Sequence, residues 1–83
     1  MYELNPELEK KLIKLARKDP VAYDIVMKKI EEIIDSDINH YKNLRYDLKE
    51  CKRVHIGSFV LIFSAKDDIV YFLDYEHHDK IYR

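Results

Sequence analysis

Apolar residues recur with the period of an α-helix over the amino-terminal part of this chain. Two stretches show it, one after Asn5-Pro6 and one after Asp19-Pro20, and each starts with a capping residue followed by proline. The apolar positions that share a helix face are Leu8, Leu12, Leu15 and Ala16 in the first stretch and Ala22, Ile25, Val26, Ile30, Ile33 and Ile34 in the second. The spacing predicts two consecutive helices of about 15 residues each, joined as an αα-hairpin.

From Cys51 onward the apolar period changes from helical to alternating, which is typical of β-strands. Residues 53–56 alternate, and the following run FVLIFSA (59–65) is apolar on both sides, as a central strand requires. A turn at residues 66–68 leads into a third run, IVYFLDY (69–75). The pattern predicts three consecutive strands in an antiparallel meander.

These elements predict an α+β fold in one domain, residues 1–83, with the helical hairpin packed on one face of a small antiparallel sheet. Residues 1–4 are long enough for a short amino-terminal edge strand, although four residues do not decide the matter. The other face of the sheet is expected to stay partly open. We assign Phe59 and Leu61 to the helix side and Val60 to the open side, so arginine at position 60 should be tolerated.

Composition narrows the cellular setting and the classes of site. One glycine and two prolines leave no room for a flexible linker or a glycine-rich phosphate loop. The sequence shows no secretory leader and no long apolar run, which argues against secretion and against a membrane span. Cys51 is the sole cysteine, so no internal disulfide can form, and we expect a cytoplasmic location.

The distribution of charge is more informative than the formal net charge of −1. Residues 42–55 hold five basic side chains against two acidic ones, a local excess of three. Electrostatic binding requires only a local cationic surface, so a nucleic-acid partner is compatible with the neutral average.

Three segments of the carboxy-terminal half resemble motifs of the RelE/ParE toxin superfamily. Residues 43–48 (NLRYDL) are similar to its leucine-arginine-glycine loop, with Tyr46 where glycine is usual. Residues 53–63 (RVHIGSFVLIF) are similar to its basic-x-basic-x-Gly-x-aromatic-Arg strand pattern, and residues 77–83 (HHDKIYR) to its ending. The resemblance implies the same fold, a helical hairpin on a small antiparallel sheet.

The resemblance implies one of two activities. RelE-type members cut messenger RNA in the ribosomal decoding site, whereas ParE-type members poison DNA gyrase and cut nothing; both are neutralised by an antitoxin that wraps around the toxin. We favour a ribosome-dependent mRNA endonuclease whose partners are a cognate antitoxin, the ribosome and mRNA. The alternative is a ParE-like gyrase poison, or a degenerate member that only binds its antitoxin.

Metal-free RNA cleavage needs a base for the 2′-hydroxyl, an acid for the leaving oxygen and cations for the phosphorane. Arg53 and His55 project from the same strand face and can share one phosphate, although such a pair is also typical of a solvated outer face. His77 and Tyr82 come from the chain end, which in the family folds back beside the open face of the sheet. Histidine suits either proton role, and tyrosine can donate a proton or stack on a base.

The remaining predicted contacts are to RNA, and no metal or cofactor is expected. The residues assigned to phosphate binding are Arg45, Lys49, Lys52, Lys80 and Arg83. A metal site at His77-His78 is disfavoured because adjacent side chains on an extended chain point apart, while a site needs three or four converging ligands. One departure speaks against catalysis: Val60 stands where active RelE-type members usually have arginine.

Overall fold

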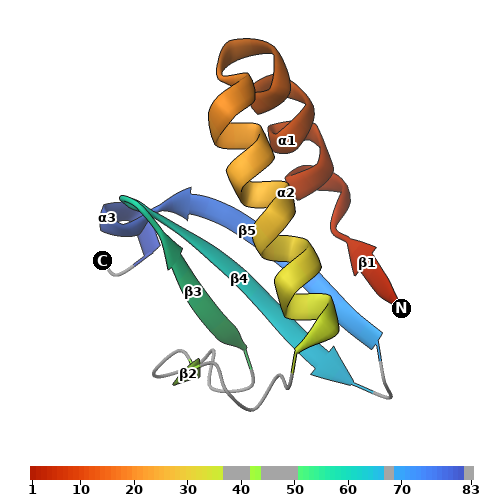
Figure 1. Cartoon of the computed structure of the whole chain (residues 1–83). Coiled ribbons are helices and arrows are strands. Elements are labelled where there is room, and N and C mark those ends of the chain that lie inside the picture. The colour runs from red at the N-terminus through yellow and green to blue at the C-terminus, as the bar shows by residue number, and fades with distance from the viewer. Residues whose placement is uncertain (37–41, 44–50, 67–68, 82–83) are drawn as a thin grey trace.

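A computed structural model describes residues 1–36, 42–43, 51–66 and 69–81, with only the backbone described at 42–43. The helices are α1 (Pro6–Lys18), α2 (Pro20–Asp35) and α3 (His78–Ile81). The strands are β1 (Tyr2–Leu4), β2 (Lys42–Asn43), β3 (Lys52–Ile56), β4 (Phe59–Lys66) and β5 (Ile69–His77). The predicted α+β class is confirmed: Figure 1 shows the α1–α2 hairpin lying over one face of the sheet.

Both long helices begin where the capping signals predict. The Asn5 side chain accepts a hydrogen bond from the amide of Glu7 at 2.9 Å, and proline follows at the first helical position. Asp19 repeats the arrangement for α2, accepting the Ala22 amide at 3.1 Å, while its own amide donates to the Leu15 carbonyl at 2.8 Å. One residue therefore ends α1 and starts α2, which makes the hairpin connection short.

The sheet contains the predicted antiparallel meander β3–β4–β5 and two further short strands. Its order is β1-β5-β4-β3-β2, so β4 is central. The amino-terminal edge strand forms, and it runs parallel to β5, pairing Tyr2 with Val70 and Leu4 with Phe72. The antiparallel sheet is therefore mixed at this edge. A β-bulge interrupts the β4–β5 register between Ile62 and Phe63.

The main core lies between the hairpin and the sheet. Its buried members are Leu8, Leu12, Val26, Ile30, Ile33, Leu61, Phe63, Val70, Phe72 and Tyr75. Half of the predicted helix stripe is buried here, and Leu15 and Ile34 are partly buried against it; Ile25 instead leaves 49% of its surface exposed. Phe59, predicted to face the helices, stacks on Tyr75 of this core with ring centroids 4.9 Å apart.

A second, smaller cluster covers the face that was expected to be open. Val60 and Ile62 are buried there, with Cys51, Leu73 and Ile81 packed against them. Ile81 comes from α3, so the last helix covers the side of the sheet that the hairpin leaves free. The facing assigned to Val60 is confirmed, but the expectation that arginine is tolerated there is wrong, because Val60 has no exposed surface.

None of the helices in the described ranges is both long enough and apolar enough to cross a bilayer.

Replacing Val60 by arginine should lower the free energy of unfolding by at least about 3 kcal/mol, since it buries a charge in an apolar cluster. Urea denaturation measures this. His55→Arg is the matched control, because His55 is the direct cross-strand neighbour of Val60 and its side chain is exposed. A Val60→Arg variant as stable as the control would show that α3 does not cover this face.

Candidate functional site

Arg53 and His55 form a hydrogen-bonded pair on β3. The Arg53 Nη1 atom lies 2.8 Å from the His55 Nε2 atom. Their cross-strand partners on β4 are Ile62 and Val60, which places the pair on the face opposite the hairpin. Val54, between them in sequence, packs into the main core instead. The prediction that Arg53 and His55 share one face is confirmed.

The contact of 2.8 Å determines which nitrogen of the neutral His55 ring carries the proton. A guanidinium has donors and no acceptor, so His55 Nε2 must accept the hydrogen bond and its proton must sit on Nδ1. The pair is therefore arranged so that a phosphate that draws Arg53 away would release the Nε2 lone pair. A released lone pair next to a phosphate is what a general base requires.

His77 ends β5 and lies on the other face of the sheet. Its register partner is Phe59, and the two rings meet edge to face with centroids 5.5 Å apart. The structure therefore brings Arg53 and His55 together, but it places His77 on the side of Phe59 and Tyr75. The bulge explains this difference, because it shifts the alternation of β5 so that Phe72 and Tyr75 both face the hairpin.

The chain turns after His77, and α3 returns over the face that carries Arg53 and His55. The His78 amide donates to the Ser58 carbonyl at 3.0 Å, which attaches the start of α3 to the β3–β4 turn. Figure 1 shows α3 at the end of the sheet where β3 turns into β4. Gly57, in that turn, adopts φ of +62°, a conformation that favours glycine.

His77, His78 and Asp79 converge, contrary to the expectation that adjacent side chains diverge. One ligand atom from each lies within 4.8 Å of the others, because α3 begins at His78. These residues already contact one another: the Asp79 backbone amide donates to His77 Nδ1 at 3.2 Å, and Asp79 Oδ1 lies 2.9 Å from His78 Nδ1. Within the described residues a metal ion would find three ligands here, two of them exposed, and it would have to displace these contacts. We therefore describe the three residues as a hydrogen-bonded chain end.

The outer edge of β5 carries an ion cluster that sequence analysis missed. The Lys11 Nζ atom on α1 lies 2.6 Å from Asp74 Oδ1, 3.0 Å from Glu76 Oε2 and 3.4 Å from the Tyr75 carbonyl oxygen. The carboxylates also accept backbone amides, Asp74 from Tyr75 at 2.8 Å and Glu76 from His77 at 3.1 Å. The signal was the acid-x-acid spacing of Asp74 and Glu76 together with a lysine beside the apolar stripe of α1.

The cluster shifts the ionisation of its members. The hydrogen bond from Lys11 and then that from the His77 amide hold the pKa of Glu76 below its ordinary value of 4.5. Burial is the largest influence on Lys11 and opposes its charge, but the two carboxylates together outweigh it and raise its pKa above 10.5. Burial, and then the charge of Asp19, raises the pKa of Tyr75 above 10.0.

The predicted RNA-binding residues divide into those that the structure describes and those that it does not. Lys52 begins β3 opposite Phe63, so it lies on the hairpin side rather than beside Arg53. Lys80 is exposed on α3, with Nζ 3.8 Å from Glu76 Oε1. The other predicted RNA-binding residues, Arg45, Lys49 and Arg83, lie outside the described ranges, as does Tyr82 of the predicted catalytic set.

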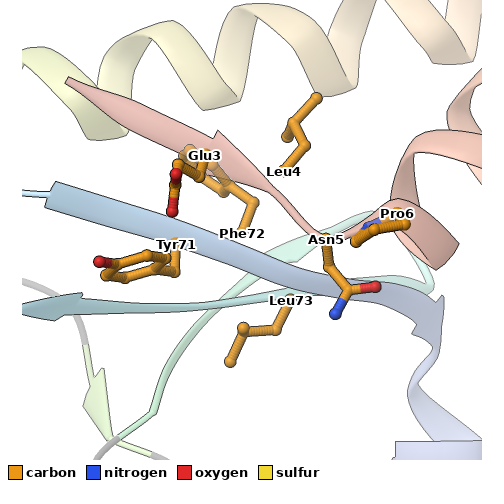
Figure 2. A pocket seen from close by; sticks show the side chains of 7 residues that line it. All are labelled: Glu3, Leu4, Asn5, Pro6, Tyr71, Phe72 and Leu73. Atoms are coloured by element: carbon orange, nitrogen blue, oxygen red, sulfur yellow. The ribbon is translucent and has the colours of Figure 1, made fainter.

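A hollow of about 420 Å³ lies at the β1 edge of the sheet, beside β1 and β5 (Figure 2). Its lining residues are Glu3, Leu4, Asn5, Pro6, Tyr71, Phe72 and Leu73. None of the described residues that line it belongs to the predicted site, and β4 separates β5 from β3. The Arg53–His55 pair is therefore the better candidate for chemistry.

The comparisons with known proteins agree with the fold and decide the family. Residues 2–82 match the family described as the ParE toxin of the parDE type II toxin–antitoxin system. This chain belongs to the RelE/ParE superfamily of type II toxins. A protein of Methanocaldococcus jannaschii assigned by name as toxin RelE4 is 46% identical over 88 residues, covering 100% of this chain and 93% of its own length. An uncharacterized protein of Methanosarcina mazei is 41% identical, with 96% and 95% covered.

Solved toxin structures share the fold at low identity. YafQ from E. coli superposes with a TM-score of 0.77 at 16% identity, covering 100% of this chain and 98% of YafQ. The YoeB–YefM complex from Staphylococcus aureus gives 0.78 at 11% identity, with 94% and 95% covered. The RelBE2 complex from Mycobacterium tuberculosis gives 0.60 at 18% identity, with 93% and 95% covered. The toxin fold is thus common to chains with very different sequences.

The hydrogen bonds predict opposite tautomers for two histidines of the toxin. At a pH where both rings are neutral, His55 should carry its proton on Nδ1, and His77, whose Nδ1 accepts the Asp79 amide, on Nε2. Long-range ¹⁵N–¹H correlation spectra distinguish the two forms. Arg53→Gln should remove the preference of His55 and leave that of His77, which serves as the internal control. Identical tautomers in the parent protein would contradict the assignment.

Acid should weaken the attachment of α1 to β5. Because the folded-state pKa of Glu76 is lowered, the contribution of Glu76 to stability is complete above pH 4.5. It is lost as the pH falls through the lowered pKa. Because the folded-state pKa of Lys11 is raised, the contribution of Lys11 to stability is complete below pH 10.5. It is lost as the pH rises through the raised pKa. The difference in unfolding free energy between the parent and Lys11→Met should therefore be larger at pH 7 than at about pH 3.

The matched control is Lys10→Met, which removes the same charge from α1 at a solvent-exposed pair, Lys10 Nζ to Glu7 Oε1 at 3.8 Å. Urea titrations of the three proteins at both pH values give the comparison. The control should stay close to the parent throughout. A Lys11→Met difference that remains undiminished in acid would show that Glu76 is not its electrostatic partner.

Proposed function

We propose that this type II toxin is a ribosome-dependent mRNA endonuclease that cleaves RNA without a metal ion. The observation that carries the proposal is the Arg53–His55 contact of 2.8 Å on the face opposite the hairpin. It joins a cation that can bind phosphate to a neutral imidazole. The Nε2 lone pair of this imidazole accepts from Arg53 until a phosphate draws Arg53 away. The substrate would be messenger RNA held in the decoding site, with the ribosome as the partner that presents it.

The proposed roles follow from the chemistry of strand cleavage. Arg53 binds the scissile phosphate and stabilises its added charge, while His55, released from Arg53, takes the proton of the 2′-hydroxyl. His77 is assigned to the leaving oxygen, because its Nε2 proton points away from the contact with Asp79. Tyr82 is assigned to proton donation or base stacking. The RNA would cross the end of the sheet where β3 turns into β4, since His55 and His77 both lie near that end.

A cognate antitoxin is the proposed protein partner. Structures of similar fold contain toxin–antitoxin complexes, YoeB–YefM and DinJ–YafQ among them. The excess of three basic charges over residues 42–55 favours an acidic antitoxin segment that blocks access of phosphate. Arg45, Lys49, Lys52, Lys80 and Arg83 remain assigned to RNA phosphates. We place both the antitoxin complex and the RNA cleavage in the cytoplasm.

Gyrase poisoning without catalysis is the second candidate. Val60 stands where active RelE-type members usually have arginine, and its full burial leaves no room for a charged side chain. One missing donor of this kind costs on the order of 10²–10³ in rate. A toxin that lost it would depend on Arg53, His55, His77 and Tyr82 alone, or would retain only its protein partners.

Cleavage of mRNA on programmed ribosomes, without added metal beyond that of the ribosome buffer, separates the candidates. The parent toxin should cut the mRNA in the decoding site and leave the supercoiling activity of gyrase unchanged. Arg53→Gln, His55→Gln, His77→Ala and Tyr82→Phe should each lower the cleavage rate about 10²-fold or more, with unchanged melting temperatures. Inhibition of gyrase without RNA cleavage would overturn the proposal and favour the second candidate.

A further inference from the structure

We propose that Lys11 is a positioning residue for the toxin's RNA-cleaving site, a role that rests on the function proposed above. Among the described residues, its polar contacts are to Asp74, Tyr75 and Glu76, and none of these is a proposed catalytic group. Instead it fixes the end of β5, on which His77 lies and from which α3 departs. Neither the family resemblance nor the spacing of the motifs points to this residue, which lies in the helical hairpin.

The place of Lys11 on α1 makes it a rigid support. It stands three residues after Leu8 and four before Leu15, so it flanks the helix face that is buried in the main core. Its backbone is therefore held by packing that does not depend on its charge. The ammonium group extends from this fixed point to the edge of β5.

Within the described part of the chain, no strand pairs with that edge at the place where Lys11 binds it. The pairing of β1 with β5 ends at Leu4 and Phe72, and the Asn5 amide donates to the Phe72 carbonyl at 2.9 Å as the chain turns into α1. Beyond this point Lys11 binds the Tyr75 carbonyl oxygen at 3.4 Å. A strand end held on one side only is free to fray unless side chains satisfy its outer backbone groups.

The Glu76 carboxylate transmits the position of Lys11 to the site. Its Oε2 atom accepts from Lys11 at 3.0 Å, and its Oε1 atom accepts from the His77 amide at 3.1 Å. The same Oε1 atom lies 3.8 Å from Lys80 Nζ on α3. One carboxylate thus joins α1, the backbone of His77 and the last helix.

Protection of an open strand edge against aggregation is the competing explanation. A lysine protects such an edge at any position along it. Loss of this protection would reduce solubility without changing the cleavage rate of the ribosome-bound toxin. Positioning, by contrast, affects the rate of the chemical step more than the binding of the ribosome.

The kinetic test is single-turnover cleavage, with toxin in excess over ribosomes that hold a defined mRNA. Lys11→Met should lower the saturating rate roughly tenfold or more and change the half-saturating toxin concentration less than about twofold. Lys11→Arg should recover most of the rate, because it restores a cation at the same place. Glu76→Gln, which keeps an oxygen for the His77 amide but no charge for Lys11, should fall between. Lys10→Met is the matched control and should behave as the parent.

Amide hydrogen exchange of the free toxin tests the same role without the ribosome. Lys11→Met should speed exchange of the Tyr75 and His77 amides about tenfold or more, whereas Lys10→Met should not. Unchanged exchange at His77, or a Lys11→Met variant that aggregates but keeps the parent's saturating rate, would overturn the inference. Failure of the parent to cleave mRNA would instead refute the proposed function, and the exchange data would still decide whether Lys11 fixes this segment.

Discussion

The burial of β4 on both of its faces is the constraint on which the rest of the toxin depends. Leu61 and Phe63 face the hairpin, whereas Val60 and Ile62 face the opposite side, and all four are buried. A strand of this kind needs two covers, and in the described part of this 83-residue chain the helical hairpin supplies one of them. The chain end supplies the second cover through Ile81. Packing of β4 thus determines where α3 lies, and α3 in turn brings the chain end to the face of the proposed site.

The fold could be predicted from the sequence wherever a residue type has one dominant local effect. Asn5 and Asp19 cap helices that are followed at once by proline, and the alternation around Val54 gives a strand, so the hairpin and the meander were predictable. The parallel pairing of β1 was not, because three residues carry no period and the partner strand follows more than sixty residues later. The cover over Val60 was missed because Ile81 stands alone among polar neighbours, where no apolar pattern marks a core residue.

The site was predictable in part for a related reason. Arg53 and His55 are two apart on a regular strand, so their common face follows from the period of two. His77 was expected beside them because the family resemblance implies a chain end that folds back beside the open face. Strict alternation from Phe72 along β5 would give the same face. A bulge adds one residue to β5 opposite β4, which turns Tyr75 toward the hairpin and His77 with it. No residue in this part of the sequence announces a bulge, since Leu73 suits a regular strand equally well.

The bulge also explains why the end of β5 carries an acidic edge that a lysine of the hairpin can bind. Without it, Asp74 and Glu76 would continue the face of Phe72 and lie under the hairpin, where two carboxylates would have to be desolvated. With it, they pair with Ile62 and Val60 and leave the hairpin face. At the edge of β5 their oxygens accept the amides of β5 and a cation from α1. The edge then carries two negative charges at hydrogen-bond distance from Lys11. The bulge therefore has two effects. It separates His77 from Arg53, and it creates the acidic edge by which α1 can hold His77 in place.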